Sequence, residues 1–277
     1  MDTQDLKLLN ELKVGIVGCG HLGQAIAQSL IAHGLNKESL LISYRGNPLT
    51  YQKLEANGLA SCLTDNETLF KEAGIILIIT RPQDVSELGG VVVSDKSIIV
   101  SCMAGVPIDV LNGIFKTEVY RMMFSGPDTI SIEKGVAAAH PQNDLLEMLT
   151  HMLKLRYIRI GAEKDLDVFT AGVCLPAAIL KLNNQDACSS AIEKIGSYFP
   201  LLAELYAWAA SSLPDLKTGA EKDMYIERMC TKGGITEAII NSIQEGESLD
   251  AALIRGIDRS KEISSEISKT IANSEKK

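Results

Sequence analysis

The sequence predicts an α/β protein in which a doubly wound parallel sheet is followed by an all-helical domain. Short apolar runs alternate with helix-like segments through the first half of the chain, and this alternation is typical of a parallel sheet covered on both faces. After about Gly161 the apolar residues recur at helical spacing and no convincing strand remains. We therefore expect a boundary near residue 161, with one domain over 1–161 and a second over 162–277.

The elements of both domains follow from the apolar spacing. In the first domain, strands are expected at 13–18, 39–45, 74–80, 96–105, 119–124 and 155–161. Residues 1–13 read as a short amphipathic helix, and further helices at 21–34 and 48–58 each end at a glycine, which favours a helix C-terminus. In the second domain, helices are expected at 165–182, 197–213, 221–229, 235–244 and 248–271.

The composition excludes several classes of protein. The chain has 277 residues and a net charge of −8, and it carries no basic stripe, so we expect no nucleic-acid partner. The longest apolar run, at 74–80, is too short to span a bilayer, so no membrane association is expected. The six cysteines form no closely spaced pair and no ligand cluster, and residues 1–13 do not resemble a signal peptide. Reduced thiols, no metal and a cytoplasmic location are therefore expected.

A glycine motif joins the first expected strand to the helix that follows. Gly18, Gly20 and Gly23 have the spacing of a dinucleotide-binding turn, in the strand-to-helix context that such a turn requires. Gly18 would permit the tight turn, Gly20 would let a pyrophosphate approach, and Gly23 would let helix and strand pack closely. The amides at the helix start, around His21 and Leu22, would face the phosphates.

The end of the second expected strand favours NADP(H) over NAD(H). NAD-selective sites place a carboxylate there to bind the ribose 2′-hydroxyl, but this segment has none. Ser43, Arg45 and Asn47 could instead bind a 2′-phosphate. The alternative is that Arg45 is a solvated surface side chain.

Five segments together resemble the pyrroline-5-carboxylate reductase family, and they cover most of the chain from about residue 13 to about 265. These segments are GIVGCGHLGQAI at 15–26, TDNETLFKEAGIILIITRPQDV at 64–85, VSCMAGVPIDVL at 100–111, TKGGIT at 231–236 and ALIRGIDRSKEI at 252–263. The resemblance implies an N-terminal Rossmann domain and a C-terminal helical domain that builds an intertwined homodimer or a higher oligomer. It implies hydride transfer from NADP(H), or NAD(H), to a small cyclic imine, which yields L-proline.

The resemblance also assigns residues to the site. It implies cofactor contacts from Asn66, Thr80, Arg81, Pro82 and Ala104. Arg81 stands where the family has Lys.

The substrate side is implied by the glycine pair of the second domain. In the family, the amides of this turn bind the substrate carboxylate, a role that passes here to Gly233 and Gly234, while Thr236 would face the imine nitrogen as the catalytic residue. The alternative for Thr236 is that it caps the helix.

The chain departs from the family pattern mainly on the substrate side. After the strand at 119–124, the family's Asn and Thr are absent and Ser125 is the remaining hydroxyl. The segment 172–176 has lost both family serines, and Lys232 replaces a proline. Cys174, within the altered segment, is expected to pack rather than to act as a nucleophile, because no His or Asp stands near it in sequence.

Two other functions remain open at this point. One is an oxidoreductase of related fold that acts on another small imine or on a hydroxy or keto acid, for which Lys181 would be the nearest catalytic lysine. The other is a non-catalytic NADP(H)-binding sensor, which would need the residues at 18–23 and 43–47 but no ordered substrate segment.

Overall fold

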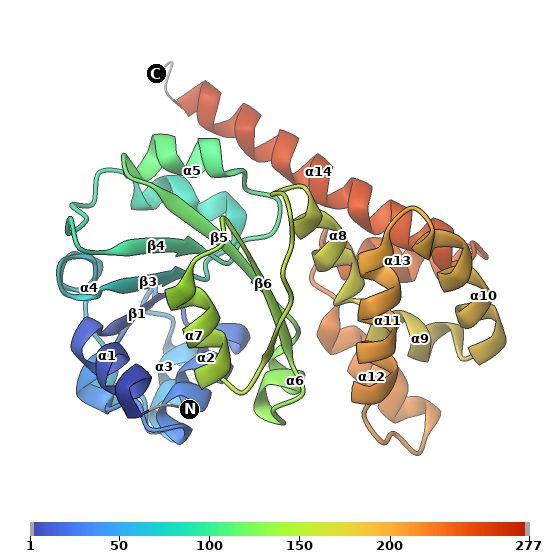
Figure 1. The fold of residues 1–277 in the computed structure, drawn as a ribbon, viewed down its shortest axis with the longest axis horizontal. Coiled ribbons are helices and arrows are strands. Elements are labelled where there is room, and N and C mark those ends of the chain that lie inside the picture. Colours follow the sequence, from blue (N-terminus) through green and yellow to red (C-terminus); the bar gives the residue numbers. More distant parts are fainter. Residues whose placement is uncertain (1–2, 275–277) are drawn as a thin grey trace. The chain divides into compact units, whose positions relative to one another are not determined.

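The computed structural model describes residues 3–274 (Figure 1). Contacts within the chain divide it into two compact units. The first unit holds the described residues up to Ile160 together with those from Ile267, and the second holds Gly161–Glu266. Each unit is described below by itself.

A seven-stranded sheet forms the centre of the first unit, in the order β2-β1-β3-β4-β5-β6-β7. The strands are β1 (Val14–Val17), β2 (Leu40–Ser43), β3 (Ile75–Ile78), β4 (Ile98–Ser101), β5 (Val119–Phe124), β6 (Val136–His140) and β7 (Arg156–Tyr157). The strands from β1 to β5 pair in parallel, with Val14 opposite both Leu40 and Ile75. The strands β2 and β3 lie on opposite sides of β1, so the order in which strands are added to the sheet reverses at β1. Ligands bind at such a switch point in α/β sheets.

Helices cover both faces of this sheet, as predicted. The helices of the unit are α1 (Thr3–Leu12), α2 (His21–Ala32), α3 (Pro48–Ala56), α4 (Asn66–Glu72), α5 (Ile108–Phe115), α6 (Pro127–Ser131) and α7 (Asp144–Met152), with short 3₁₀ turns η1 (Lys37–Ser39), η2 (Ala60–Cys62) and η3 (Pro82–Leu88). A Cβ atom on Gly15 would meet Leu69 of α4, whereas the neighbouring Ile16 lies against Gly23 of α2. Successive residues of a strand face opposite sides, so α4 and α2 cover opposite faces.

The strand β6 is the main difference from the predicted sheet. The sequence predicts no strand there and a wholly parallel sheet, but β6 exists and pairs antiparallel with β5, with Met123 opposite Ala138. Its three consecutive alanines, Ala137 to Ala139, are fully buried but lack the β-branched side chains that mark strands. Some ends also differ: the strand expected at 96–105 ends at Ser101, and the one expected at 155–161 is reduced to Arg156–Tyr157.

The described residues Gly161–Glu266 form helices and no strand, which agrees with the all-helical second domain that the sequence predicts (Figure 1). The helices are α8 (Asp165–Gly172), α9 (Leu175–Leu182), α10 (Gln185–Gly196), α11 (Pro200–Ser212), α12 (Gly219–Met229), α13 (Ile235–Gln244) and α14 (Leu249–Ser274), the last of which continues into the first unit. The predicted helices do not include α10. A Cβ on Gly256 of α14 would lie 2.6 Å from Ile239 of α13, so these two helices pack closely.

Candidate functional site

The turn after β1 is fixed by the two neighbouring strands. The Gly18 amide donates a hydrogen bond to the Ser43 carbonyl oxygen at the end of β2 (3.0 Å). Gly18 has a φ of +90°, and a Cβ here would lie 2.9 Å from both the Ile79 carbonyl oxygen and Thr80 Cγ2. Glycine alone fits this position without strain. Thr80, one of the predicted cofactor contacts, therefore lies directly against the turn.

The backbone is tightly packed at Gly23, whereas the space beside Gly20 is free of atoms from the described residues. A Cβ on Gly23 would lie 2.7 Å from the Gly18 carbonyl oxygen, whereas one on Gly20 would meet no atom within 4 Å. Gly20 is the N-cap of α2, and no side chain among residues 3–274 caps this helix. The first amides of α2, at His21 and Leu22, therefore face an open approach, and this geometry suits the pyrophosphate of a dinucleotide.

Ser43 provides a second indication that a polar ligand fits here. Its side chain is 4% exposed, and its hydroxyl has no hydrogen-bond partner among the described residues. A buried hydroxyl left without a partner costs about 1–3 kcal/mol. A ligand group at the carboxyl end of β2 would satisfy it.

Arg45 and Arg81, which follow different strands, are joined by one carboxylate. Arg45 Nη2 lies 3.0 Å from Asp84 Oδ1 and 2.6 Å from Glu87 Oε2, while Arg81 Nε donates to Asp84 Oδ2 (3.0 Å). Both acids belong to η3, which begins at Pro82. The side chain of Arg45 is half-exposed and ion-paired, and its contact with a 2′-phosphate stays a prediction.

Two further predicted cofactor residues start helices. Asn47 caps α3, since its Oδ1 accepts from the amides of Leu49 (2.9 Å) and Thr50 (3.2 Å). Asn66 is the first residue of α4 and follows the capping residue Asp65.

Three further segments lie near the turn or near the strands that lead to it. The Thr64 amide donates to the Ile42 carbonyl oxygen (2.9 Å), which places this segment beside β2. Ala104 precedes Gly105 in the turn after β4. Lys53 of α3 lies 3.5 Å from His21 Nε2, so a cation stands at the start of α2.

Cys19, within the glycine turn, carries a neutral thiol. The side chain is 2% exposed. Burial, with a smaller contribution from Cys62, raises the pKa of the Cys19 thiol to about 12. The turn therefore presents no thiolate to an incoming phosphate.

Ser125, predicted to contact the substrate, follows β5 and is fully buried. Its hydroxyl oxygen accepts from Thr129 Oγ1 (2.7 Å) and from the Val136 amide (3.0 Å). These contacts connect the end of β5 to the start of β6. They give Ser125 a role in holding this connection, and its substrate contact stays a prediction.

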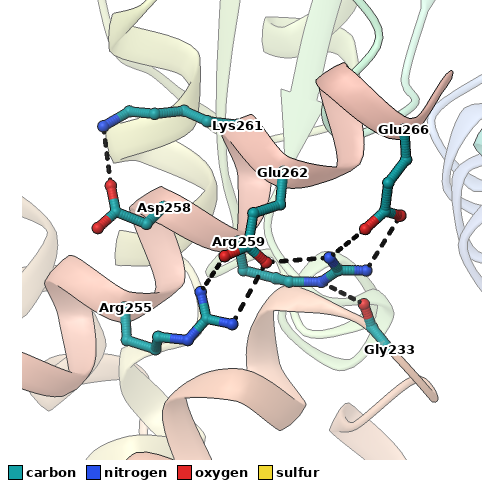
Figure 2. A network of polar contacts seen from close by, with 7 residues as sticks. All are labelled: Gly233, Arg255, Asp258, Arg259, Lys261, Glu262 and Glu266. Atoms are coloured by element: carbon teal, nitrogen blue, oxygen red, sulfur yellow. Dashed lines mark hydrogen bonds and ion pairs between the residues drawn. The ribbon is translucent and has the colours of Figure 1, made fainter. Parts of the chain in front are cut away.

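In the second unit, the glycine pair precedes α13. Gly234 is the N-cap of α13, and Gly233 has a φ of +71°. The Gly233 amide donates to Glu237 Oε2 (2.6 Å), and Arg259 Nε of α14 donates to the Gly233 carbonyl oxygen (2.9 Å). As Figure 2 shows, the Arg259 guanidinium also binds Glu262 and Glu266, so that α14 braces the glycine turn.

Thr236 does not cap the helix. The helix begins at Ile235 after the N-cap Gly234, so this alternative for Thr236 is wrong. Its hydroxyl lies instead 3.2 Å from the sulfur of Cys174, at the junction of α8 and α9. Cys174 of the altered segment and Thr236 of α13, 62 residues apart in sequence, therefore meet through their side chains.

Cys174 is buried, and its chemistry fits a packing role. Burial raises the pKa of the Cys174 thiol to about 11, against a smaller lowering by the hydrogen bond with Thr236. A neutral thiol is a poor nucleophile.

The residues of these networks that were not predicted include Asp84, Glu87, Glu237 and Arg259. Glu237 carried a usable signal, because Glu at the third position of a helix often binds an amide before it. Arg259 lies in the segment 252–263, which resembles the family, but its contact with Gly233 spans 26 residues. Among the residues that the structure describes, no group of three or more side chains could hold a metal ion, and no helix is both long and apolar enough to cross a bilayer.

Comparison with known proteins agrees with this architecture. Residues 13–105 match the family described as NADP oxidoreductase coenzyme F420-dependent. The chain is 25% identical to pyrroline-5-carboxylate reductase 2 of Bacillus subtilis, over 94% of this chain and 96% of the relative. It is 27% identical to pyrroline-5-carboxylate reductase of Methanosarcina acetivorans, over 91% and 97% respectively.

A solved structure shares the fold. The structure of Plasmodium falciparum pyrroline carboxylate reductase with NADP bound covers 92% of this chain and 99% of its own, with a TM-score of 0.57 and 15% identity. The fold and the open glycine turn define a Rossmann-type oxidoreductase with a helical second unit. Within that class, the chain is similar over more than nine-tenths of its length to the two pyrroline-5-carboxylate reductases of Bacillus subtilis and Methanosarcina acetivorans.

Proposed function

We propose that the chain reduces pyrroline-5-carboxylate to L-proline with NADPH, and with NADH less efficiently. The observation that carries this proposal is the open turn at Gly20 beside the unpartnered Ser43 hydroxyl, in a chain that matches reductases of this substrate along nearly its whole length. Bound NADPH would supply the hydride. The residues of the chain then need to hold the nicotinamide and the imine carbon of the substrate close together, and such positioning can account for much of a rate acceleration.

The first domain, 1–161, is proposed to hold the cofactor. The backbone at Gly18, Gly20 and Gly23 and the amides of His21 and Leu22 would bind the pyrophosphate. The 2′-phosphate would be bound by Ser43, Arg45 and Asn47. Contacts to the remainder of the cofactor are proposed for Asn66, Thr80, Arg81, Pro82 and Ala104.

The second domain, 162–277, is proposed to bind the substrate and to form the dimer. The amides of Gly233 and Gly234 would bind the ring carboxylate, because a helix N-terminus favours anions. Thr236 Oγ1 would hydrogen-bond the imine nitrogen, and Ser125 would approach the same ring. A homodimer or higher oligomer in the cytoplasm is proposed, and the free thiols of all six cysteines are compatible with that compartment.

Arg45→Ala is expected to weaken NADPH binding by about 10- to 100-fold and to leave NADH binding within about twofold. The variant removes the cation that pairs with Asp84 and Glu87. The negative charges of these two side chains would then repel a 2′-phosphate. Fluorescence titration of both cofactors measures the difference. Glu87→Gln is the matched control, and we expect it to strengthen NADPH binding slightly. Equal losses for NADPH and NADH in Arg45→Ala would remove Arg45 from the phosphate site.

The function itself is tested by mixing the protein with NADPH and pyrroline-5-carboxylate and following the nicotinamide absorbance. We expect rapid oxidation by the native chain and a turnover about 10²- to 10³-fold lower in Thr236→Ala, with an unchanged Kd for NADPH. Cys174→Ala, which removes the other partner of the Thr236 contact, should retain most of the activity. If the native chain binds NADPH but leaves pyrroline-5-carboxylate unreduced, the proposed substrate is wrong. If Thr236→Ala retains full turnover, Thr236 is not catalytic.

A further inference from the structure

The peptide group at Gly233 is bound on both of its sides. Its amide donates to Glu237 Oε2 over 2.6 Å, and its carbonyl oxygen accepts from Arg259 Nε over 2.9 Å. Figure 2 shows the Arg259 side of this arrangement. The Gly233 amide is one of the two proposed to bind the substrate carboxylate. In this structure the side-chain carboxylate of Glu237 already binds it.

The hydrogen bonds of Arg259 go to groups other than Glu237. The Arg259 guanidinium donates through Nε to the Gly233 carbonyl, through Nη1 to Glu262 and Glu266, and through Nη2 to Glu266. Arg255, the next cation along α14, is bound to Glu262. Both guanidiniums are thus engaged with other carboxylates, while Glu237 binds the Gly233 amide just before its own helix.

We propose that Glu237 determines the affinity for the substrate carboxylate by competing with it for the Gly233 amide. This inference rests on the proposed function, in which the same turn binds the ring carboxylate. The structure adds that this amide donates to a carboxylate oxygen over 2.6 Å, which is what the anchoring of an acidic substrate requires. A substrate carboxylate must displace Glu237 and then lie close to its charge, and both effects raise the KM.

The competing interpretation is a purely structural one. Glu237 is the third residue of α13 and could serve only to satisfy an amide before the helix. Glutamine separates the two interpretations, because its side-chain oxygen still accepts from the amide while the negative charge is lost. A structural role predicts no change in Glu237→Gln, whereas competition predicts tighter substrate binding.

The test compares two substrates that differ only in the carboxylate. For Glu237→Gln we expect a roughly three- to tenfold lower KM for pyrroline-5-carboxylate. The KM for 1-pyrroline, the same ring without the carboxylate, and the Kd for NADPH should stay within twofold. Glu245→Gln is the matched control, because Glu245 is exposed at the other end of α13 and the variant has the same change in net charge. We expect it to leave every constant unchanged.

Each failure has a separate meaning. If the native chain reduces pyrroline-5-carboxylate and Glu237→Gln has the same or a higher KM for it, the competition is disproved while the proposed function stands. An equal fall in KM for both substrates, or the same fall in Glu245→Gln, also overturns the competition. If the native chain reduces neither ring, the proposed function has failed and this inference fails with it.

Discussion

Gly20→Ala is expected to weaken NADPH binding by about 100-fold while the Tm of the free protein stays unchanged. Gly20 has a φ of −75° and a ψ of −156°, an extended conformation that alanine adopts. A methyl group there would meet no atom of the protein within 4 Å. It would occupy the open approach to the first amides of α2, and displacement of a bound group by about 1 Å can cost two orders of magnitude.

Gly18→Ala is the matched control for this result. Alanine at Gly18 would need a φ of +90° and would lie 2.9 Å from the Ile79 carbonyl oxygen, so it should destabilise the fold by about 1–3 kcal/mol. Thermal unfolding without ligand and fluorescence titration with NADPH measure the two effects. A lowered Tm in Gly20→Ala, or unchanged NADPH affinity, would contradict the assignment of Gly20 to the pyrophosphate approach.

Arg259→Lys is expected to raise the KM for pyrroline-5-carboxylate by about 10- to 100-fold. A lysine retains the positive charge near Glu262 and Glu266, but a single ammonium group cannot bind both carboxylates and the Gly233 carbonyl with the fork of a guanidinium. The glycine turn would lose its brace from α14. Because the proposed cofactor contacts lie in the other unit, the Kd for NADPH should stay within twofold.

Arg255→Lys separates this effect from a general loss of charge pairing. Arg255 lies on the same helix and binds Glu262, and Figure 2 shows no contact between Arg255 and Gly233. Its substitution should leave the KM unchanged. Steady-state kinetics and the Tm are measured for both variants. Arg259 is a positioning residue only if Arg259→Lys raises the KM for pyrroline-5-carboxylate more than Arg255→Lys does, at a similar Tm.

Much of the fold could be predicted from the sequence because local patterns specify it. Short apolar runs predicted β1 to β5, and helical spacing predicted most of the second unit. The strand β6 lacks such a pattern, because three of its five residues are alanines. The helix α10 does carry one: Cys188, Ala191, Ile192 and Ile195 are buried at helical spacing, so this helix could have been predicted and was missed.

The candidate site also has one part that a local sequence pattern specifies and another that depends on residues distant in sequence. The glycine turn could be predicted because its function uses a short stretch of backbone with fixed spacing. The networks around it could not, since Arg45 and Glu87 are 42 residues apart and Thr236 meets Cys174 over 62. Such pairs form only after the strands and helices have been placed.

The hydrogen bond from the Gly18 amide to the Ser43 carbonyl has a consequence for evolution and for redesign. This hydrogen bond between the turn and β2 joins main-chain atoms, whereas the groups proposed to distinguish the two cofactors are side chains on and after that strand. If Arg45 binds the 2′-phosphate as proposed, substitutions at Arg45, Asp84 or Glu87 would alter which nicotinamide cofactor is used and would leave this main-chain hydrogen bond in place. In a lineage that adapts to a change in the cellular supply of reducing equivalents, the exposed positions Arg45 and Glu87 are therefore the ones that we expect to change first.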